Sequence, residues 1–146
     1  MPVEMAANTQ YSIALHLLAA LAAKGEPVHS RKLASSVNTS PSFVRRILSK
    51  LSKAGLVRAT TGNEGATSLA KEPKRISLLD IYLAVKAPKA FCIHAHPPLK
   101  HCFVSVHIKS VQEKTLGKAQ KAFEDSLSAV NLEQFLAAIH RTAKRK

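Results

Sequence analysis

Between Arg31 and Arg58 the chain carries seven Lys and Arg residues and no acidic residue. These cations are Arg31, Lys32, Arg45, Arg46, Lys50, Lys53 and Arg58. They lie over two short amphipathic segments that are joined by a turn at residues 37–41. This pattern is typical of a helix-turn-helix that binds nucleic acid, because Lys and Arg neutralise phosphates and release condensed counterions. We therefore expect affinity for DNA.

The bulk composition limits the class of protein. With 146 residues and a formal charge of +13, the chain has the size of one domain, or of a small domain with a dimerisation arm. An aromatic content of 5% and the absence of Trp favour aliphatic, mainly helical packing. Two cysteines are too few for a disulfide framework, and the most apolar window, Ile13 to Ala23, is too short for a membrane helix. We expect a cytoplasmic protein without a leader or a transmembrane segment.

Three helices are predicted in the first half of the chain. Residues 9–24 repeat Leu and Ala at helical spacing. Residues 29–36 form a second predicted helix, with Ser30 as its N-cap. The third helix is expected to begin near Pro41, because Ser40 can cap free backbone amides and Pro is tolerated at the first helical position.

The third helix leads into a hairpin. Residues 42–54 place apolar side chains on one face and Ser, Arg and Lys on the rest, and Gly55 is predicted as a left-handed C-cap. Strand-like residues 56–61 and 66–70 flank a turn at 62–65. Three helices and a hairpin in this order predict a winged helix, so the expected fold class is mainly α with a small β-hairpin.

The second half of the chain is predicted to hold a helix, a loop and a long helix. Residues 77–85 form a helix that ends before Pro88, and residues 104–127 carry apolar side chains every three to five positions. A long helix must bury such a stripe, and a second copy of it is the simplest partner. A two-fold dimer would set two recognition helices one DNA turn apart, roughly 34 Å. The tail from Arg141 to Lys146 is basic and is expected to fray.

The predicted parts are a winged helix-turn-helix domain (1–87), a Cys/His/Pro loop (88–103), and a long dimerisation helix with a C-terminal tail (104–146).

Several motifs follow one another in an order that resembles a known family. They are Ser40-Pro41-Ser42-Phe43-Val44 at the start of the recognition helix, residues 51–57 at its end, residues 62–70 in the wing, and residues 76–81 in the next helix. Over almost the whole chain, this order resembles the Rrf family of bacterial winged-helix transcriptional regulators, the group of IscR, NsrR and CymR. The resemblance implies a homodimer that binds a palindromic operator and usually represses.

Two departures from the family pattern affect the expected chemistry. Relatives that bind iron–sulfur clusters carry three cysteines before the long helix, whereas this chain has only Cys92 and Cys102. Thiolates of one chain alone therefore cannot hold a cluster, and the chain is similar to the YwnA-like branch, which lacks the three-cysteine motif. Many relatives also carry Arg before the first wing glycine and Gly-Gly-Tyr after it, where this chain has Thr61 and Gly-Ala-Thr at 65–67. We expect the wing to contact phosphates and to read little sequence.

The predicted DNA contacts centre on the recognition helix. Its first turn enters the major groove, so the side chains there are predicted to reach base edges. These side chains are Ser40, Ser42 and either Arg45 or Arg46. Four other cations are expected to contact phosphates or to stay solvated, and they are Arg31, Lys32, Lys50 and Lys53. The complete predicted DNA-binding set is Arg31, Ser40, Pro41, Ser42, Arg45, Arg46, Lys50, Thr61 and Asn63.

A loop of thiols and imidazoles is the second candidate site. Its members are Cys92, His94, His96, His101 and Cys102. Three interpretations stay open: a plain structural loop, a thiol sensor, or a site for zinc, copper(I) or an iron–sulfur cluster with mixed ligands. The spacing matches no standard zinc motif, so we assign no metal ligand and expect no resident cofactor. His16, within the apolar first helix, is interpreted as a core or interface histidine without a functional role.

These features together predict a sequence-specific DNA-binding transcriptional regulator. We expect a repressor that binds a palindromic operator in double-stranded DNA as a homodimer, with no membrane partner. The chain lacks a Gly-rich phosphate loop, an H-E-x-x-H pair and a G-x-S-x-G elbow, so we expect no enzyme. Two alternatives remain: a winged helix used as a protein-interaction module, and an architectural DNA binder without sequence preference.

Overall fold

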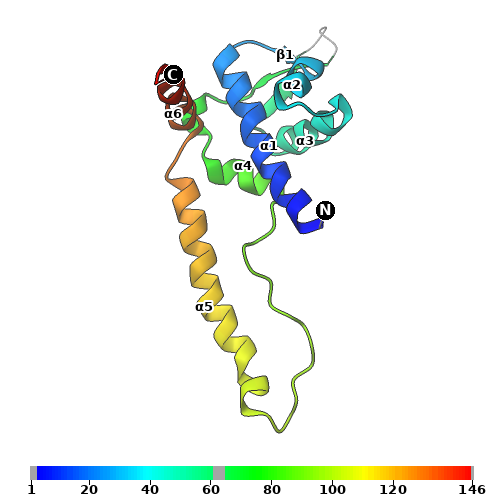
Figure 1. The fold of residues 1–146 in the computed structure, drawn as a ribbon, viewed down its shortest axis with the longest axis vertical. Helices are drawn as coiled ribbons and strands as arrows, with labels where there is room; N and C mark the ends of the chain where they lie inside the picture. Colours follow the sequence, from blue (N-terminus) through cyan, green and yellow to red (C-terminus); the bar gives the residue numbers. More distant parts are fainter. Residues whose placement is uncertain (1–2, 61–64, 146) are drawn as a thin grey trace.

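The computed structural model describes residues 3–60 and 65–145. Its elements follow in the order α1 (Val3–Lys24), β1 (Val28–His29), α2 (Ser30–Val37), α3 (Pro41–Lys53), β2 (Val57–Ala59), β3 (Ala66–Leu69), η1 (Pro73–Arg75), α4 (Leu78–Ala84), α5 (Phe103–Ser128) and α6 (Leu132–Lys144). Figure 1 shows a head that holds every element except α5, and an arm in which α5 and the preceding loop project from the head. The fold is thus mainly α with a small sheet, as predicted. None of the described helices is long and apolar enough to cross a membrane.

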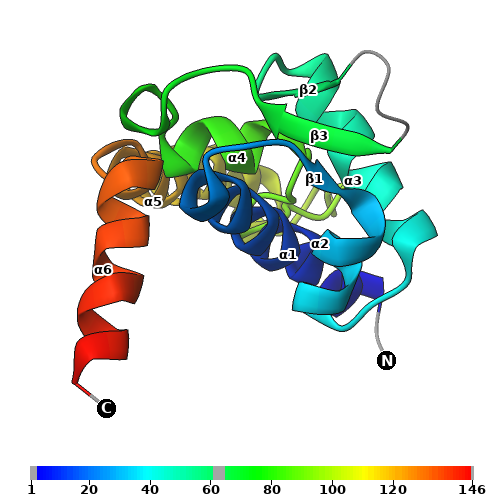
Figure 2. The same cartoon turned by 90° about the horizontal axis from the view of Figure 1, so that it is seen from above.

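The core of the head is built around α1. Its sequence, rich in Ala and Leu, places Leu17, Leu18 and Leu21 in the interior, where each is almost fully buried. Helices α2, α3, α4 and α6 and the sheet all pack against α1 (Figure 2). Burial of one Leu side chain stabilises a fold by about 1.5–3 kcal/mol. The predicted helix at 9–24 is confirmed, and it begins earlier, at Val3.

Local signals set the helix-turn-helix. Helix α2 ends at Asn38, which adopts a left-handed φ of 66° and allows the Thr39 N–H to donate back into α2 at 3.0 Å. Ser40 then caps α3, because its Oγ accepts a hydrogen bond from the Phe43 N–H at 3.3 Å, and Pro41 is the first helical residue. The predicted start of the recognition helix is confirmed.

The prediction of Ser30 as the N-cap of α2 is wrong. His29 holds that position, and Ser30 is a buried first residue of the helix. The reason is β1, a strand of two residues that is too short to show a periodicity. It pairs with β3 in an antiparallel sheet of order β1-β3-β2, and the Ser30 N–H donates to the Gly65 carbonyl at 2.9 Å. The two predicted strands are present but are shorter than 56–61 and 66–70.

Helix α3 ends in front of a glycine. Gly55 has a φ of 77°, and its N–H donates to the Ser52 carbonyl at 2.9 Å. The Leu56 N–H donates to the Leu51 carbonyl at 3.0 Å. These two bonds form a Schellman motif, which satisfies carbonyls in the last turn of a helix. The predicted left-handed cap is confirmed.

The elements between the wing and the arm also agree with prediction. Helix α4 corresponds to the predicted helix at 77–85, and its N-cap Ser77 forms a capping box with Asp80. The short helix η1 was not predicted, since its three residues carry no pattern. Residues 87–102 contain no helix or strand, as expected of a Cys/His/Pro loop, and α5 begins at Phe103.

The C-terminal segment corrects a prediction. Residues 141–144 of the basic tail, which was expected to fray, are helical because they belong to α6. Asn131 and Gln134 form a capping box at the start of α6, a signal that is present in the sequence. Leu132 is fully buried in the head, and its N–H donates to the Ile76 carbonyl at 2.8 Å. The segment predicted as one long helix with a tail is therefore two helices, and the second belongs to the head.

One buried glutamine joins the arm to the head. On α5, Gln120 Oε1 accepts a hydrogen bond from the Ala90 N–H at 2.9 Å, and Nε2 donates to the Tyr82 hydroxyl at 3.2 Å. The Tyr82 hydroxyl in turn donates to the Pro88 carbonyl at 2.7 Å, and its ring lies edge-to-face with Phe123 of α5. The root of the loop, α4 and α5 are therefore held in one cluster.

Tyr11 of α1 extends this cluster. Its ring lies edge-to-face with that of Tyr82, with centroids 5.5 Å apart, and its hydroxyl donates to the Leu78 carbonyl at 2.8 Å. Burial, and secondarily the nearby Tyr82, raises the pKa of Tyr11 to about 12. The protonated hydroxyl is thus the form that the fold favours.

We expect Tyr11→Phe to lower the free energy of unfolding by about 1 kcal/mol at neutral pH, because it removes the bond to Leu78. The folded-state pKa lies above the ordinary value of 10.0, so the wild-type chain loses this advantage as the pH rises from 10.0 toward about 12. Urea unfolding of both chains from neutral pH to about pH 11 measures the difference. If the difference in unfolding free energy between the two chains does not decrease as the pH rises, the stabilising role of the protonated Tyr11 hydroxyl is contradicted.

Gly55→Ala should lower the free energy of unfolding by about 1 kcal/mol, because a side chain is strained at φ +77° even though no atom lies within 4 Å of its Cβ. The matched control is Gly117→Ala, within α5, where space is equally open and φ is ordinary. That change should stabilise by about 0.5–1 kcal/mol, since Ala favours a helix interior. Urea unfolding gives both values, and two effects of the same sign would contradict the cap geometry.

Candidate nucleic-acid interface

The outer face of α3 carries cations and hydroxyls. Its inner face is apolar and buried, through Val44, Ile47, Leu48 and Leu51. The exposed side chains on the opposite line, at helical spacing, are Ser42, Arg46, Ser49 and Lys53. Arg45 is exposed beside this line, and neither α2, α3 nor β2 contains an Asp or Glu residue. This face offers hydrogen-bond donors and positive charge without a competing carboxylate.

The two arginines of α3 are held differently. The Arg46 guanidinium lies over the Phe43 ring, 5.2 Å from its centroid. At an exposed site such a cation–π contact contributes about 0.5–1 kcal/mol and limits the rotamers of the side chain. Arg45 makes no hydrogen bond, ion pair or ring contact with the residues that the structure describes. Arg46 is therefore partly pre-oriented, whereas Arg45 is free to turn toward a ligand.

Lys50 lies at the side of the predicted interface. Its Nζ donates to Gln10 Oε1 of α1 at 2.9 Å, and the side chain is partly buried. The acceptor is a neutral amide, so this bond brings no acidic group to the recognition helix. Lys50 therefore ties the recognition helix to α1, a contact that the spacing of cations in the sequence did not indicate.

The other predicted contacts border the helix-turn-helix. Arg31 is exposed in the first turn of α2. Ser40 and Ser42 are exposed, with hydroxyl oxygens 3.3 Å apart, but Ser40 is already engaged as the cap of α3. Thr61 and Asn63, predicted in the wing, lie outside the described residues. Ser42 is thus the hydroxyl of the first turn that is better placed to bind a base.

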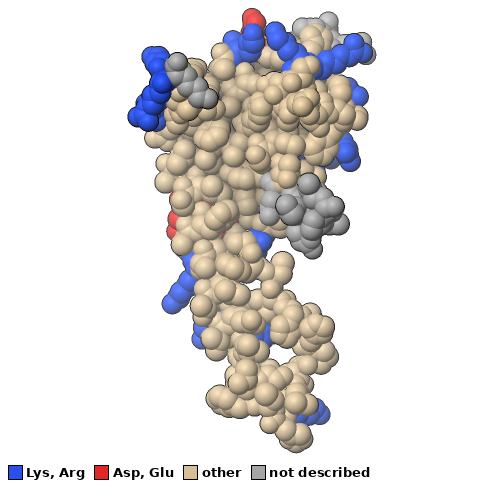
Figure 3. All heavy atoms as spheres, in the orientation of Figure 1, with Lys and Arg blue, Asp and Glu red and all other residues tan. Residues whose placement is uncertain are grey.

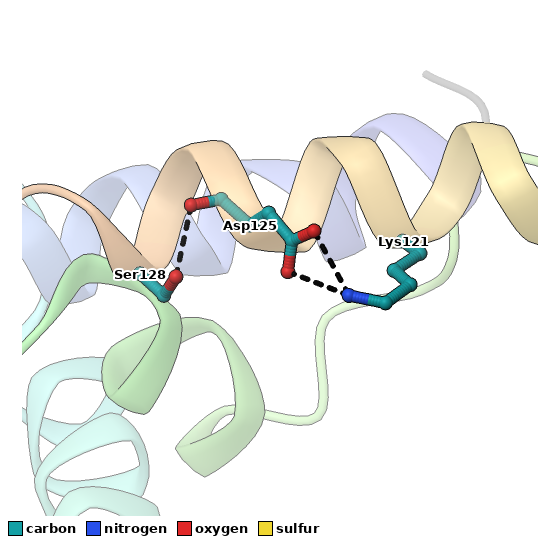
Figure 4. A network of polar contacts seen from close by, with 3 residues as sticks. All are labelled: Lys121, Asp125 and Ser128. Carbon is teal, nitrogen blue, oxygen red and sulfur yellow. Dashed lines mark hydrogen bonds and ion pairs between the residues drawn. The ribbon is translucent and has the colours of Figure 1, made fainter.

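Lys and Arg side chains lie on both the head and the arm. Figure 3 shows Lys and Arg side chains along the margin of the head over the wing and the helix-turn-helix, and at the end of α6. The two ion pairs within the described part of the chain lie elsewhere, Lys74 with Glu72 at 3.5 Å and Lys121 with Asp125 at 2.9 Å. The second pair is on α5, where Ser128 also donates to the Asp125 carbonyl (Figure 4). Within the described residues, the cations of α3 therefore form no ion pair and are available to bind phosphates.

The Cys/His loop is assembled only in part. Both thiols are free, Cys92 exposed and Cys102 partly buried. Cys102 is the N-cap of α5, and its Sγ accepts a backbone N–H of the first turn at 3.4 Å. The rings of His94 and His96 lie 5.3 Å apart, while His101 is exposed. Within residues 3–60 and 65–145, no three His, Cys, Asp or Glu side chains gather as metal ligands would.

The chain is similar to known regulators over most of its length. It is 37% identical to the HTH-type transcriptional regulator YwnA of Bacillus subtilis over 130 residues, which are 88% of this chain and 96% of that protein. A solved DNA-binding protein is 34% identical, with a TM-score of 0.71, over 87% of this chain and 98% of that chain. Staphylococcus aureus CymR shares the fold at 23% identity and a TM-score of 0.68, over 88% of this chain and 95% of its own.

The sequence pattern of the Rrf2 family, described as an iron-dependent transcriptional regulator, matches residues 7–138. The iron in this description does not fit the donors of this chain. The chain has two cysteines, one of which caps α5, and the described residues form no group of three His, Cys, Asp or Glu side chains that could hold a metal ion. The match itself spans the helix-turn-helix, the wing, the loop and both C-terminal helices. The protein is therefore a DNA-binding transcriptional regulator and not an enzyme, and the chain belongs to the Rrf2 family.

Proposed function

We propose that the protein binds a palindromic operator in double-stranded DNA as a homodimer and represses transcription there. The observation that carries this proposal is the outer face of α3, where Arg45 and Arg46 are exposed on a helix-turn-helix that contains no Asp or Glu. Helix α3 would enter the major groove, where an Arg side chain can bind guanine with two hydrogen bonds. A repressor of bacterial genes works where the DNA lies, so we also infer a cytoplasmic location.

A second copy of the chain is the proposed cover for α5. One face of this helix meets the head through Phe123 and Leu127. A different face carries Val104, Ile108 and Val111, which are 60%, 36% and 60% exposed. At 3.6 residues per turn these three side chains lie on one line, which is about a third of a turn around the helix from the line of Phe123 and Leu127. An apolar helix face left open in this way is expected to pack on the same face of another copy.

Val111→Asp should convert the dimer to a monomer, because it buries a charge in the proposed helix pair. Ser110→Asp is the control, since Ser110 is exposed on another side of α5. Sedimentation equilibrium of both variants, with circular dichroism to confirm folding, measures the result. A Val111→Asp chain that remains dimeric would remove α5 as the interface. Deletion of the region from residue 104 is a poor test, because Leu132 lies in the core of the head.

Selection of bound fragments from bacterial genomic DNA at physiological salt tests sequence-specific binding. We expect enrichment of a palindromic site. Arg45→Ala should then weaken binding to this site by about 1–3 kcal/mol and weaken binding to random DNA much less, because a base contact is lost. Arg31→Ala removes a proposed phosphate contact, so it should weaken binding to the site and to random DNA alike. It should also reduce the slope of log binding constant against log salt concentration by about one. If no site is enriched, an architectural role on DNA or a protein-binding role replaces the proposed binding to an operator.

We also infer that the loop at 87–102 regulates DNA binding. Its root is bound to Tyr82, whose ring packs on Tyr11 of α1. The adjacent Gln10 accepts the bond from Lys50 of α3. A change in the loop can therefore reach the recognition helix through these side-chain contacts and the main chain of α1, which joins Tyr11 to Gln10. Binding to the selected site by reduced and by mildly oxidised protein should differ, and the difference should disappear when the two cysteines are replaced by Ser.

A further inference from the structure

A groove of about 540 Å³ lies between α1, the end of α2 and α6, away from the outer face of α3. Small side chains of α1, Ala19, Ala20 and Ala23, form its floor. Helix α6 forms one wall, with Leu136 and Ile139, and Figure 2 shows the end of α6 diverging from the head. A mainly apolar hollow of this volume lies within the range of small-molecule sites, about 300–1,000 Å³.

Two imidazoles supply polar groups to the groove from different helices. His16 lies on α1 with its Nε2 2.9 Å from Ser36 Oγ of α2, and His140 lies on α6. An adjoining hollow shares Ala20, Ala23 and Ser36 with the groove, and Lys24 and Lys32 are also part of its lining. No Asp or Glu occurs among the described residues that line either hollow. Donors and positive charge therefore border an apolar surface without a carboxylate that would repel an anion.

We propose that this groove binds a small apolar anion, such as an aromatic or branched aliphatic carboxylate. Its apolar body would lie on Ala20 and Ala23, and its acid group would accept hydrogen bonds from His16 and His140. Charge complementarity supports this occupant, since the imidazoles and the nearby Lys24 and Lys32 can donate hydrogen bonds to an acid group, whereas a neutral apolar solute would use none of these donors.

The position of the groove gives such a ligand a regulatory effect. Its walls come from α2, which is part of the helix-turn-helix, and from α6, which follows the proposed dimer helix. A ligand that prefers one spacing of these helices shifts the protein toward that spacing and thereby changes affinity for the operator. This consequence rests on the proposed function, whereas binding of the ligand does not.

The test uses a fluorescent apolar anion, 8-anilinonaphthalene-1-sulfonate, and N-phenyl-1-naphthylamine, which has the same aromatic body without the sulfonate. Both dyes are titrated into the full-length protein. We expect one saturable sulfonate site per chain. Ala23→Leu should weaken it at least about tenfold by filling the groove, and the control Ala129→Leu, exposed at the end of α5, should leave it unchanged. His140→Leu should weaken binding of the sulfonate and not of the neutral dye.

Each other outcome overturns the proposal. Equal binding by Ala23→Leu and Ala129→Leu places the dye elsewhere, and equal losses for both dyes in His140→Leu exclude recognition of the acid group. Binding only to the Val111→Asp monomer would show that a second copy covers the groove. Operator binding is measured on the same samples. If the protein binds its operator but not the sulfonate dye, the ligand site in the groove is disproved and the proposed function is not affected.

Discussion

Burial of the apolar face of α1 is the constraint on which the rest of the head depends. Leu17, Leu18 and Leu21 fill its interior face, and the helix-turn-helix, the sheet, α4 and α6 all take their positions from it. This arrangement makes α1 more than a support for the DNA-binding elements. Through Gln10 it contacts the recognition helix, and through Tyr11 it contacts the cluster that holds the arm. The helix at the centre of the apolar core thus connects the recognition helix to the arm.

The parts of the fold that the sequence predicted well are those with local signals. Ser40 and Pro41 at the start of α3, and Gly55 after its end, act through neighbouring backbone groups, so residue type and spacing were sufficient. Ser30 was assigned wrongly as a cap because residue type alone cannot show that a two-residue strand precedes it. Helix α6 was missed although Asn131 begins a capping box, because the basic residues that follow were interpreted as a frayed tail.

The candidate site shows the same division between local and tertiary information. Exposure of Arg45 and Arg46 follows from the helical periodicity, whereas the bond from Lys50 to Gln10 joins residues 40 positions apart. Gln120 had no sequence signal at all, because one Gln in a long exposed helix is ordinary. Its role depends on Tyr82 and on the main chain of the loop, which only the folded chain brings to it.

The attachment of α5 has a mechanical consequence. The helix has 26 residues and is therefore about 39 Å long, and the head holds it only through its C-terminal half, around Gln120. Its other end, capped by Cys102, lies far from this fulcrum. Between Gln120 and Phe103 the helix is about 26 Å long, so a displacement of that end by roughly 3 Å corresponds to a rotation of about 7° at the head. A movement of several ångströms at the loop would therefore change the orientation of α5 at the head by only a few degrees, close to the DNA-binding elements.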